Sequence, residues 1–468
     1  MNLRPERARL ALASALLTPL APALWLYTIY RSRVLKKSPA STRGMWGHLP
    51  PSARLALRSR PTAPVIWMHA VSVGEVMAAR VVARALRQVL AQRQVSARLF
   101  LSVTTDTGME TARAALKSGE VDAVGFYPID APAAVKRALN AVRPSVFVTL
   151  ETELWPLFLS ACRARGVRTL LANGRVSDRL ARDGARLGFL FGPMLRGFSA
   201  LLMRSPFDRA RMKSLAGSQA QIFVAGDVKL DAVEPGSGQV EAAEAEAACW
   251  KQQLGVAPEQ LLWAAGSTHP GEEELLARVY KQLKAEFPAL RLLLAPRHTE
   301  RAGEVLALLR GLGLAAVLRS ESNSGERQDA VIVLDSVGEL AQIYGCSAVA
   351  FVGGSLIERG GHNLLEPVLR GVPVAFGPHV ANFRVAAALA QEHGLGRMVH
   401  DEGELSQALA SWLHERQGTQ REAARAEFAA RVEVALRPHR GASRRVARAI
   451  VQALLGEEIE VDEAASST

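Results

Sequence analysis

The chain has 468 residues, of which 49% are hydrophobic and 22% charged, a composition that excludes an intrinsically disordered protein. This length exceeds what one hydrophobic core usually serves, so we expect two domains with a cleft between them. The net charge of +12 excludes no class of partner, because nucleic acid, an anionic membrane and a phosphorylated substrate would each attract it.

The first predicted element is an apolar segment over residues 10–30, which contains no charged residue and has basic residues on both sides. A segment of this length can just span a bilayer, and its last aromatic residues are typical of an interfacial belt. No small-residue cleavage site follows, so we predict that residues 1–40 form a retained membrane anchor with a basic flank rather than a signal peptide. Whether the anchor spans the bilayer or lies in one leaflet stays open.

Residues 41–234 are predicted to form the first domain. Short apolar runs typical of buried strands alternate here with amphipathic stretches typical of helices. The strands are expected at 65–69, 98–103, 146–150 and 168–172, with a helix over 76–90. This alternation predicts βα units on a parallel sheet.

The alternation pauses at the Pro-Gly-Ser-Gly sequence of residues 235–238, the expected linker, and restarts in a second predicted domain over residues 235–455. Strands are expected there at 261–265, 291–295, 331–334, 348–352 and 373–376. The predicted fold class is therefore α/β, with two Rossmann-like parallel-sheet domains whose ligand-binding loops lie at the carboxyl ends of the strands. Residues 456–468 are acidic and small, and we expect a disordered tail.

The first motif that suggests a catalytic role is His-Ala-Val-Ser-Val-Gly-Glu over residues 69–75, between an expected strand and an expected helix. Glu75 is thereby placed at a helix N-terminus. A carboxylate there can simply complement the helix dipole and cap free N–H groups. Because the small residues before Glu75 leave the loop open to a ligand, Glu75 can alternatively act as a general base that takes a proton from an attacking hydroxyl.

The second motif, Glu-Thr-Glu-Leu-Trp-Pro over residues 151–156, directly follows an expected strand. If that strand continues, Glu151 and Glu153 point to the same side, where each perturbs the pKa of the other. The alternative is one capping and one solvated glutamate. Lys229, in Gly-Asp-Val-Lys-Leu-Asp over residues 226–231, is either a cation of the expected cleft or a surface lysine.

Three motifs at successive strand ends of the second domain predict a site for the phosphate of a nucleotide: residues 266–273, 295–298 and 353–367. Glycines permit close backbone approach, and a helix starting near Asn363 would aim free N–H groups at an anion. Arg297 would neutralise the phosphate, and Glu366 would accept hydrogen bonds from ribose hydroxyls. The alternative is that the paired glycines only turn the chain.

Several motifs are absent from the sequence. It contains no GxxxxGK[ST] P-loop, no Asp-x-Asp or HExxH metal motif and no GxSxG nucleophile elbow. The three cysteines are far apart and odd in number, which argues against a disulfide framework or a CxxC zinc site. We therefore expect chemistry that uses no bound metal or other cofactor.

Taken together in chain order, eight stretches resemble the 3-deoxy-D-manno-octulosonic acid (Kdo) transferases of lipopolysaccharide assembly, which are inverting glycosyltransferases of the two-domain GT-B type. The resemblance runs from the apolar segment to about residue 450. The stretches are HAVSVGE, ETELWP, NGRVSDR, GDVKLD, GSTHPGEEE, APRH, GGSLIERGGHNLLEP and FGPHVANF.

This resemblance implies CMP-Kdo as donor and the lipid A precursor lipid IVA as acceptor, handled at the cytoplasmic face of a Gram-negative inner membrane whose anionic surface suits a basic protein. It implies that Glu75 is the proton acceptor, and that Glu151 and Lys229 stabilise the transition state. The residues implied to hold CMP are Pro296, Arg297, Val337, Gly338, Glu339, Asn363, Leu364, Leu365 and Glu366. The number of Kdo units added and the oligomeric state stay open.

Other functions fit parts of the pattern. A different GT-B transferase or a sugar-nucleotide epimerase would use a uridine or other donor on the same fold. A membrane-tethered protein that only binds a nucleotide sugar would use its carboxylates as helix caps. A nucleic-acid binder is suggested by charge alone, and the scattered basic residues without an aromatic platform argue against it.

Overall fold

The computed structural model describes residues 39–59, 62–186, 188–231, 240–321, 329–418 and 421–462. The predicted apolar segment at 10–30 and the predicted linker at 235–238 lie outside the described residues. Within the described part of the chain, no helix combines the length and the apolar character needed to cross a membrane.

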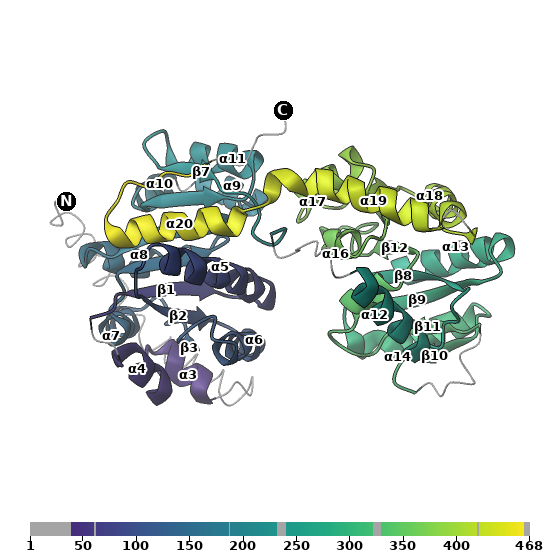
Figure 1. Cartoon of the computed structure of the whole chain (residues 1–468), viewed down its shortest axis with the longest axis horizontal. Coiled ribbons are helices and arrows are strands. Elements are labelled where there is room, and N and C mark those ends of the chain that lie inside the picture. The colour runs from purple at the N-terminus through teal and green to yellow at the C-terminus, as the bar shows by residue number, and fades with distance from the viewer. Residues whose placement is uncertain are drawn as a thin grey trace. The chain divides into compact units, whose positions relative to one another are not determined.

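The chain divides into two compact units (Figure 1): Met1–Val233 together with Pro438–Thr468, and Glu234–Arg437. Among the described residues, each unit is built on a seven-stranded sheet in which all pairs of strands are parallel. The structure therefore confirms an α/β protein with two Rossmann-like parallel sheets.

The sheet of the first unit has the strand order β3-β2-β1-β4-β5-β6-β7. Its strands are β1 (Val65–Ala70), β2 (Arg98–Val103), β3 (Ala123–Phe126), β4 (Val146–Leu150), β5 (Arg168–Gly174), β6 (Ala200–Met203) and β7 (Ile222–Val224). Every residue of β1 and β4 is buried, because helices cover both faces of the parallel sheet. These two neighbouring central strands end at the same edge of the sheet, which brings the motifs that follow them together.

The helices described in the first unit are α3 (Pro39–Met45), α4 (Pro51–Arg58), α5 (Val73–Gln92), α6 (Asp106–Lys117), α7 (Pro132–Val142), α8 (Pro156–Ala164), α9 (Asp178–Arg186), α10 (Gly188–Leu195), α11 (Pro206–Ala216) and α20 (Ala442–Leu455). The predicted helix over 76–90 is thus confirmed as part of α5. Its start is set by Ser72, whose hydroxyl oxygen caps the first turn by accepting from the N–H of Glu75.

Helix α20 corrects the predicted second domain, which was expected to extend to residue 455. The second unit ends at Arg437, and α20 packs along α5 in the first unit (Figure 1). The reason is the apolar face of α20: Val446, Ile450 and their neighbours on it are fully buried in the same core as the apolar side of α5.

The segment after α20 corrects a second expectation. Residues 456–462, expected to belong to a disordered tail, lie against the first unit: Ile459 and Val461 are partly buried against its core, and Glu457 pairs with Arg93. Residues 463–468 lie outside the description.

The sheet of the second unit has the order β10-β11-β9-β8-β12-β13-β14. Its strands are β8 (Leu261–Thr268), β9 (Leu290–Pro296), β10 (Ala316–Leu318), β11 (Val331–Val333), β12 (Val349–Val352), β13 (Val374–Phe376) and β14 (Gly396–Met398). Its described α-helices are α12 (Val240–Gln253), α13 (Glu272–Glu286), α14 (Ala302–Gly311), α15 (Leu340–Gly345), α16 (Leu365–Leu369), α17 (Arg384–Glu392), α18 (Glu402–Glu415) and α19 (Arg421–Leu436). Because β8 lies between β9 and β12, the three motifs that follow these strands share one edge.

Candidate active site

Glu75 lies in the first turn of α5, where its side chain folds back over the helix start. One carboxylate oxygen accepts from the N–H of Val71 at 2.8 Å, and the other from the hydroxyl of Ser72 at 2.9 Å. The residue is only 8% exposed. The capping role considered from the sequence is therefore present in the structure.

The surroundings of Glu75 also favour proton uptake. Burial raises the pKa of its carboxyl above the usual value, and the negative charge of Glu151 raises it further. The hydrogen bonds from Val71 and Ser72 and the charge of Lys229 act in the opposite direction. Each carboxylate oxygen can accept a second hydrogen bond, so capping leaves Glu75 able to receive one from a ligand hydroxyl.

Glu151 and Lys229 meet beside this helix start. Glu151 follows β4 in a left-handed conformation with φ +56°, and its carboxylate accepts from the Lys229 ammonium at 2.5 Å. A Cβ placed on Gly74 would lie 4.0 Å from the same ammonium nitrogen. The structure therefore brings together the three residues predicted to be catalytic, all within the first unit.

Glu153 is the fourth member of this charge cluster, although the sequence did not assign it a role. Burial and the negative charges of Glu75 and Glu151 raise its pKa to about 7. The signal was the alternation of Glu151 and Glu153, which predicted mutual pKa perturbation. The cluster thus holds three carboxyl groups and one ammonium group, and its charge changes near neutral pH.

His69, the first residue of the HAVSVGE motif, is a core residue rather than part of this cluster. Its ring is fully buried, stacks on Tyr127 at 3.8 Å between ring centroids, and hydrogen bonds through Nδ1 to the backbone and side chain of Ser102. Burial lowers the pKa of His69 to about 3, so the ring is neutral at physiological pH.

In the second unit, the glycine loop after β12 is organised by Glu272, the first residue of α13. Its buried carboxylate accepts from the N–H groups of His269, Gly354, Ser355 and Leu356 at 2.8–3.1 Å. A Cβ on Gly353 would lie 2.7 Å from the same carboxylate. The close backbone approach predicted at these glycines is therefore used by a side chain of the protein, and the three loop amides already have an acceptor.

Arg297 and Glu366 lie near each other at the edge formed by the ends of β9 and β12. Desolvation by neighbouring atoms raises the pKa of Glu366, although the residue is exposed, whereas a hydrogen bond from Asn363 at 3.2 Å and the charge of Arg297 act to lower it. The helix expected near Asn363 begins at Leu365, whose N–H is capped by the Asn363 side chain. Arg297 and Glu366, both predicted to contact a nucleotide, are therefore close enough to interact electrostatically.

Three histidines of the second-unit motifs, none of them assigned a ligand contact from the sequence, adjoin this edge. The Nε2 atoms of His269 and His362 lie 2.9 Å apart with the rings stacked, and the ring of His298 is edge-on to His269. Burial, His269 and Arg297 lower the pKa of His362 to about 4. The sequence contains one indication that these histidines lie close together, which is that each belongs to one of the three predicted nucleotide-site motifs.

The predicted turn Val337–Glu339 follows β11 and leads into α15. Val337 is 86% exposed, Gly338 has φ +96°, and the Glu339 carboxylate lies 3.4 Å from Arg319. Burial raises the pKa of Tyr344 near the end of α15, and the negative charge of Glu366 contributes to this rise. The helix that follows the turn therefore extends to the vicinity of Glu366.

The remaining predicted residues of the second unit are Pro296, the last residue of β9, and Leu364, which precedes α16; both are buried. Among the described residues, no group of three or more His, Cys, Asp or Glu side chains is arranged to hold a metal ion.

Comparison with known proteins identifies the family. Residues 48–232 match the family model described as 3-deoxy-D-manno-octulosonic-acid transferase (kdotransferase). A 3-deoxy-D-manno-octulosonic acid transferase of Haemophilus influenzae is 31% identical over 366 residues, which cover 78% of this chain and 82% of that protein. Another from Bordetella pertussis is 33% identical over 380 residues, which cover 79% and 83%.

A solved structure agrees on the fold. The crystal structure of a UDP-GlcNAc 2-epimerase from Neisseria meningitidis, bound to UDP-GlcNAc, gives a TM-score of 0.56 over 84% of this chain and all of that chain. The two sequences are only 10% identical, so the likeness concerns the GT-B-like fold alone.

The matched family model spans Glu75, Glu151 and Lys229, which the first unit brings into one cluster. The two transferases match most of this chain and most of their own lengths, as expected for shared architecture rather than a shared segment. The chain therefore belongs to the family of 3-deoxy-D-manno-octulosonic acid (Kdo) transferases.

Proposed function

We propose that this protein transfers Kdo from CMP-Kdo to lipid IVA with inversion at the anomeric carbon, and that Glu75 is the general base. Family membership supports transfer of Kdo, and the observation that carries the catalytic assignment is the cluster of Glu75, Glu151, Glu153 and Lys229. A cluster in which burial and neighbouring charges raise the pKa of two carboxyl groups, Glu75 and Glu153, is typical of catalytic sites.

In the proposed reaction, the acceptor hydroxyl loses its proton to the Glu75 carboxylate while its oxygen forms a bond to the anomeric carbon of Kdo. The bond from that carbon to the phosphate oxygen breaks, and CMP leaves with the bonding electrons. A base is most effective when its pKa is close to the working pH, so the raised pKa of Glu75 suits this role.

The ion pair of Lys229 with Glu151 would keep a positive charge beside the base. In this proposal, Lys229 stabilises negative charge that develops in the transition state, and Glu151 orients the ammonium group. The left-handed backbone at Glu151 supports a positioning role, because strained non-glycine residues cluster at functional sites.

The second unit would bind the donor. We assign the phosphate of CMP to Arg297 and the ribose hydroxyls to Glu366. The Arg297 guanidinium and the Glu366 carboxyl group already interact electrostatically. Pro296, the turn at 337–339 and residues 363–365 would complete the site. The three occupied amides of the glycine loop are not assigned to the phosphate, because they donate to Glu272.

A lipid acceptor requires access to a membrane. The proposal places the protein at the cytoplasmic face of the inner membrane, held by the apolar segment at residues 10–30 and attracted through its net charge of +12 to anionic lipid. Flotation of the full chain with anionic vesicles, compared with a variant lacking residues 1–38, tests this placement.

The central test is the Glu75→Gln variant, which retains an acceptor for the helix cap but cannot take up the proton. Incubation with CMP-Kdo and lipid IVA, followed by mass spectrometry, should show transfer reduced by about 10²- to 10⁴-fold. Glu110→Gln on α6, an exposed glutamate, is the matched control and should transfer at the wild-type rate. Near-normal turnover by the folded Glu75→Gln variant would remove Glu75 from its role.

The donor is tested separately by thermal shift. CMP should stabilise the protein more than UDP does, and Arg297→Gln should weaken this effect, since it removes a charge assigned to the phosphate. Preferential stabilisation by UDP would favour a different sugar nucleotide. A chelator should leave the transfer rate unchanged, because no step of the proposal uses a metal.

A further inference from the structure

A cavity of about 980 Å³ lies in the second unit at the amino edge of its sheet, the opposite end of the strands from Arg297 and Glu366. It is bounded by α12, the loop that leads into β8, the turn after α15 and the start of α19. None of its lining residues belongs to the motifs assigned above. Its volume is that of a site for a small organic molecule.

The deepest charged groups of this cavity are cations. Lys251 is 8% exposed, and its ammonium donates to the carbonyl oxygens of Pro258 and Gln260 at 3.2 and 2.7 Å. These two bonds leave one of the three ammonium N–H groups for a ligand. Arg416 is 5% exposed and donates to the carbonyl oxygen of Gly371.

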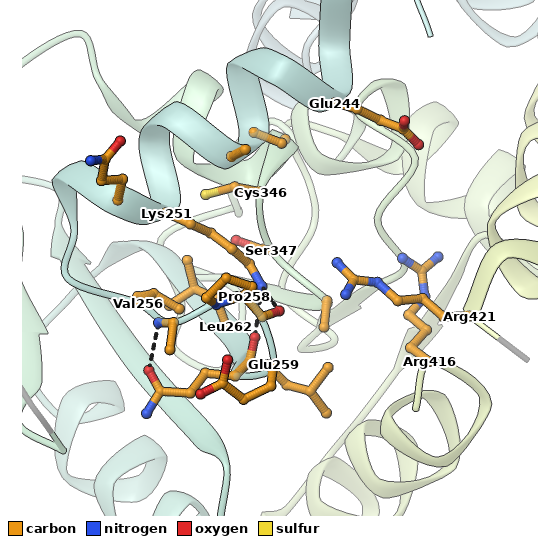
Figure 2. Close-up of a pocket in the computed structure, with 18 of the residues that line it drawn as sticks. Glu244, Lys251, Val256, Pro258, Glu259, Leu262, Cys346, Ser347, Arg416 and Arg421 are labelled. Atoms are coloured by element: carbon orange, nitrogen blue, oxygen red, sulfur yellow. Dashed lines mark hydrogen bonds between the residues drawn. The ribbon is translucent and has the colours of Figure 1, made fainter. Parts of the chain in front are cut away.

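Two further arginines from the start of α19 complete the basic lining. Arg421 and Arg425 are half-buried, and neither forms an ion pair or a hydrogen bond with a described residue. Figure 2 shows Arg416 and Arg421 on one side of the cavity and Lys251 on the other. Four cationic groups from three elements therefore line one space.

The acidic residues of the lining lie farther out. Glu244, Glu259 and Glu422 are exposed, and Asp329, also exposed, already pairs with Lys284. Water screens exposed carboxylates strongly, whereas the buried cations are screened much less. The interior of the cavity is thus positive although the formal charges of its lining balance.

The electrostatics of the buried cations agree with this picture. Burial, together with the charges of Arg421 and Arg425, lowers the pKa of Lys251 to about 8. Burial and the charge of Arg425 likewise lower the pKa of Arg416 to about 10. An anion in this space would relieve both the repulsion and the lost hydration.

We propose that this cavity is a second ligand site, separate from the proposed donor site, and that it binds the phosphate group of a small phosphorylated molecule. Phosphate suits the lining because its oxygens accept several charge-assisted hydrogen bonds at once from guanidinium and ammonium groups. The apolar side chains of Val256, Leu261 and Leu262 would contact the organic part of the ligand.

The test is made in the Arg297→Gln background, which removes the cation of the proposed donor site from every protein compared. The double substitution Arg421→Gln, Arg425→Gln is compared there with Arg113→Gln, which removes an exposed charge on α6 in the first unit. Calorimetric titration of each full-length protein with inorganic phosphate and pyrophosphate measures soluble ligands. Titration with a short-chain, water-soluble phosphatidic acid measures a lipid phosphate without membrane binding.

We expect phosphate or pyrophosphate to bind, with the affinity reduced at least about tenfold by the double substitution and unchanged by Arg113→Gln. Binding of the short-chain phosphatidic acid alone, lost in the double variant, would assign the site to a lipid phosphate. No binding of any probe, or binding that the double variant retains, would overturn the proposal. Circular dichroism checks that the double variant is folded. We expect it to fold, because both substituted positions are partly exposed.

Discussion

Replacement of Glu153 by Gln should stabilise the first unit, and the gain should grow as the pH rises. The pKa of Glu153 is about 7 in the folded protein against a usual value of 4.5. The folded state therefore binds the proton more tightly than the unfolded state, and deprotonation above pH 4.5 works against folding. The destabilisation begins near pH 5 and is complete above pH 7.

The size of the effect follows from the pKa difference. A difference of about 2.5 in pKa corresponds to about 3 kcal/mol, at about 1.4 kcal/mol for each pKa unit. Because the side chain keeps partial contact with solvent, we expect about half of this, on the order of 1.5 kcal/mol between pH 5 and pH 8. For a unit of this size, that is a rise of roughly 3–6 °C in the melting temperature at pH 8.

Thermal unfolding of full-length wild type and Glu153→Gln, followed by calorimetry at pH 5, 6, 7 and 8, measures this gain. Glu110→Gln serves as control, because it removes an exposed carboxyl and should change stability equally little at every pH. A difference between wild type and Glu153→Gln that stays constant from pH 5 to pH 8 would refute the reasoning.

Two further predictions concern the second unit. Glu272→Gln should lower the free energy of unfolding by about 3 kcal/mol, because the new amide NH2 group would face backbone N–H groups that in the wild type donate to a carboxylate oxygen. Hydrogen exchange should show that the 353–356 loop opens in this variant but not in the control Glu300→Gln, which changes an exposed glutamate. Gly266→Ala should lower the free energy of unfolding, measured by chemical denaturation, by at least about 1–3 kcal/mol, because the new Cβ would lie 1.9 Å from the hydroxyl oxygen of the buried Tyr344. The control Gly303→Ala has open space around the new Cβ and should leave this free energy unchanged or raise it.

The sequence predicted the central strands of both sheets because each is a continuous apolar run. Residues 98–103 and 146–150 match β2 and β4 at both ends, and the other predicted strands differ from the structure by a few residues. Strands β3, β6, β7, β10 and β14 were missed. Each has only three or four residues, but so do β11, β12 and β13, which were predicted, and length alone therefore does not explain the misses. Four of the five, β3, β7, β10 and β14, lie at the edge of a sheet.

The partners of the long-range contacts could not be predicted from residue patterns. Glu272 and the glycine loop are more than 80 residues apart, and glycine pairs look the same whether a carboxylate of the protein or a ligand approaches them. Lys229 and Glu151 are 78 residues apart and could be paired only through the family resemblance. Helix α20 displays an apolar face in its sequence, but such a face does not specify which sheet it covers.

The position of α20 has a consequence for synthesis on the ribosome. The first unit receives part of its core from the final helix, so it cannot close that core until all residues of the second unit have been translated. Until then the apolar side of α5 lacks its cover, which leaves a nascent chain open to aggregation or chaperone binding. Chains truncated after residue 437 and released should therefore contain a second unit that can fold and a first unit that is still incomplete.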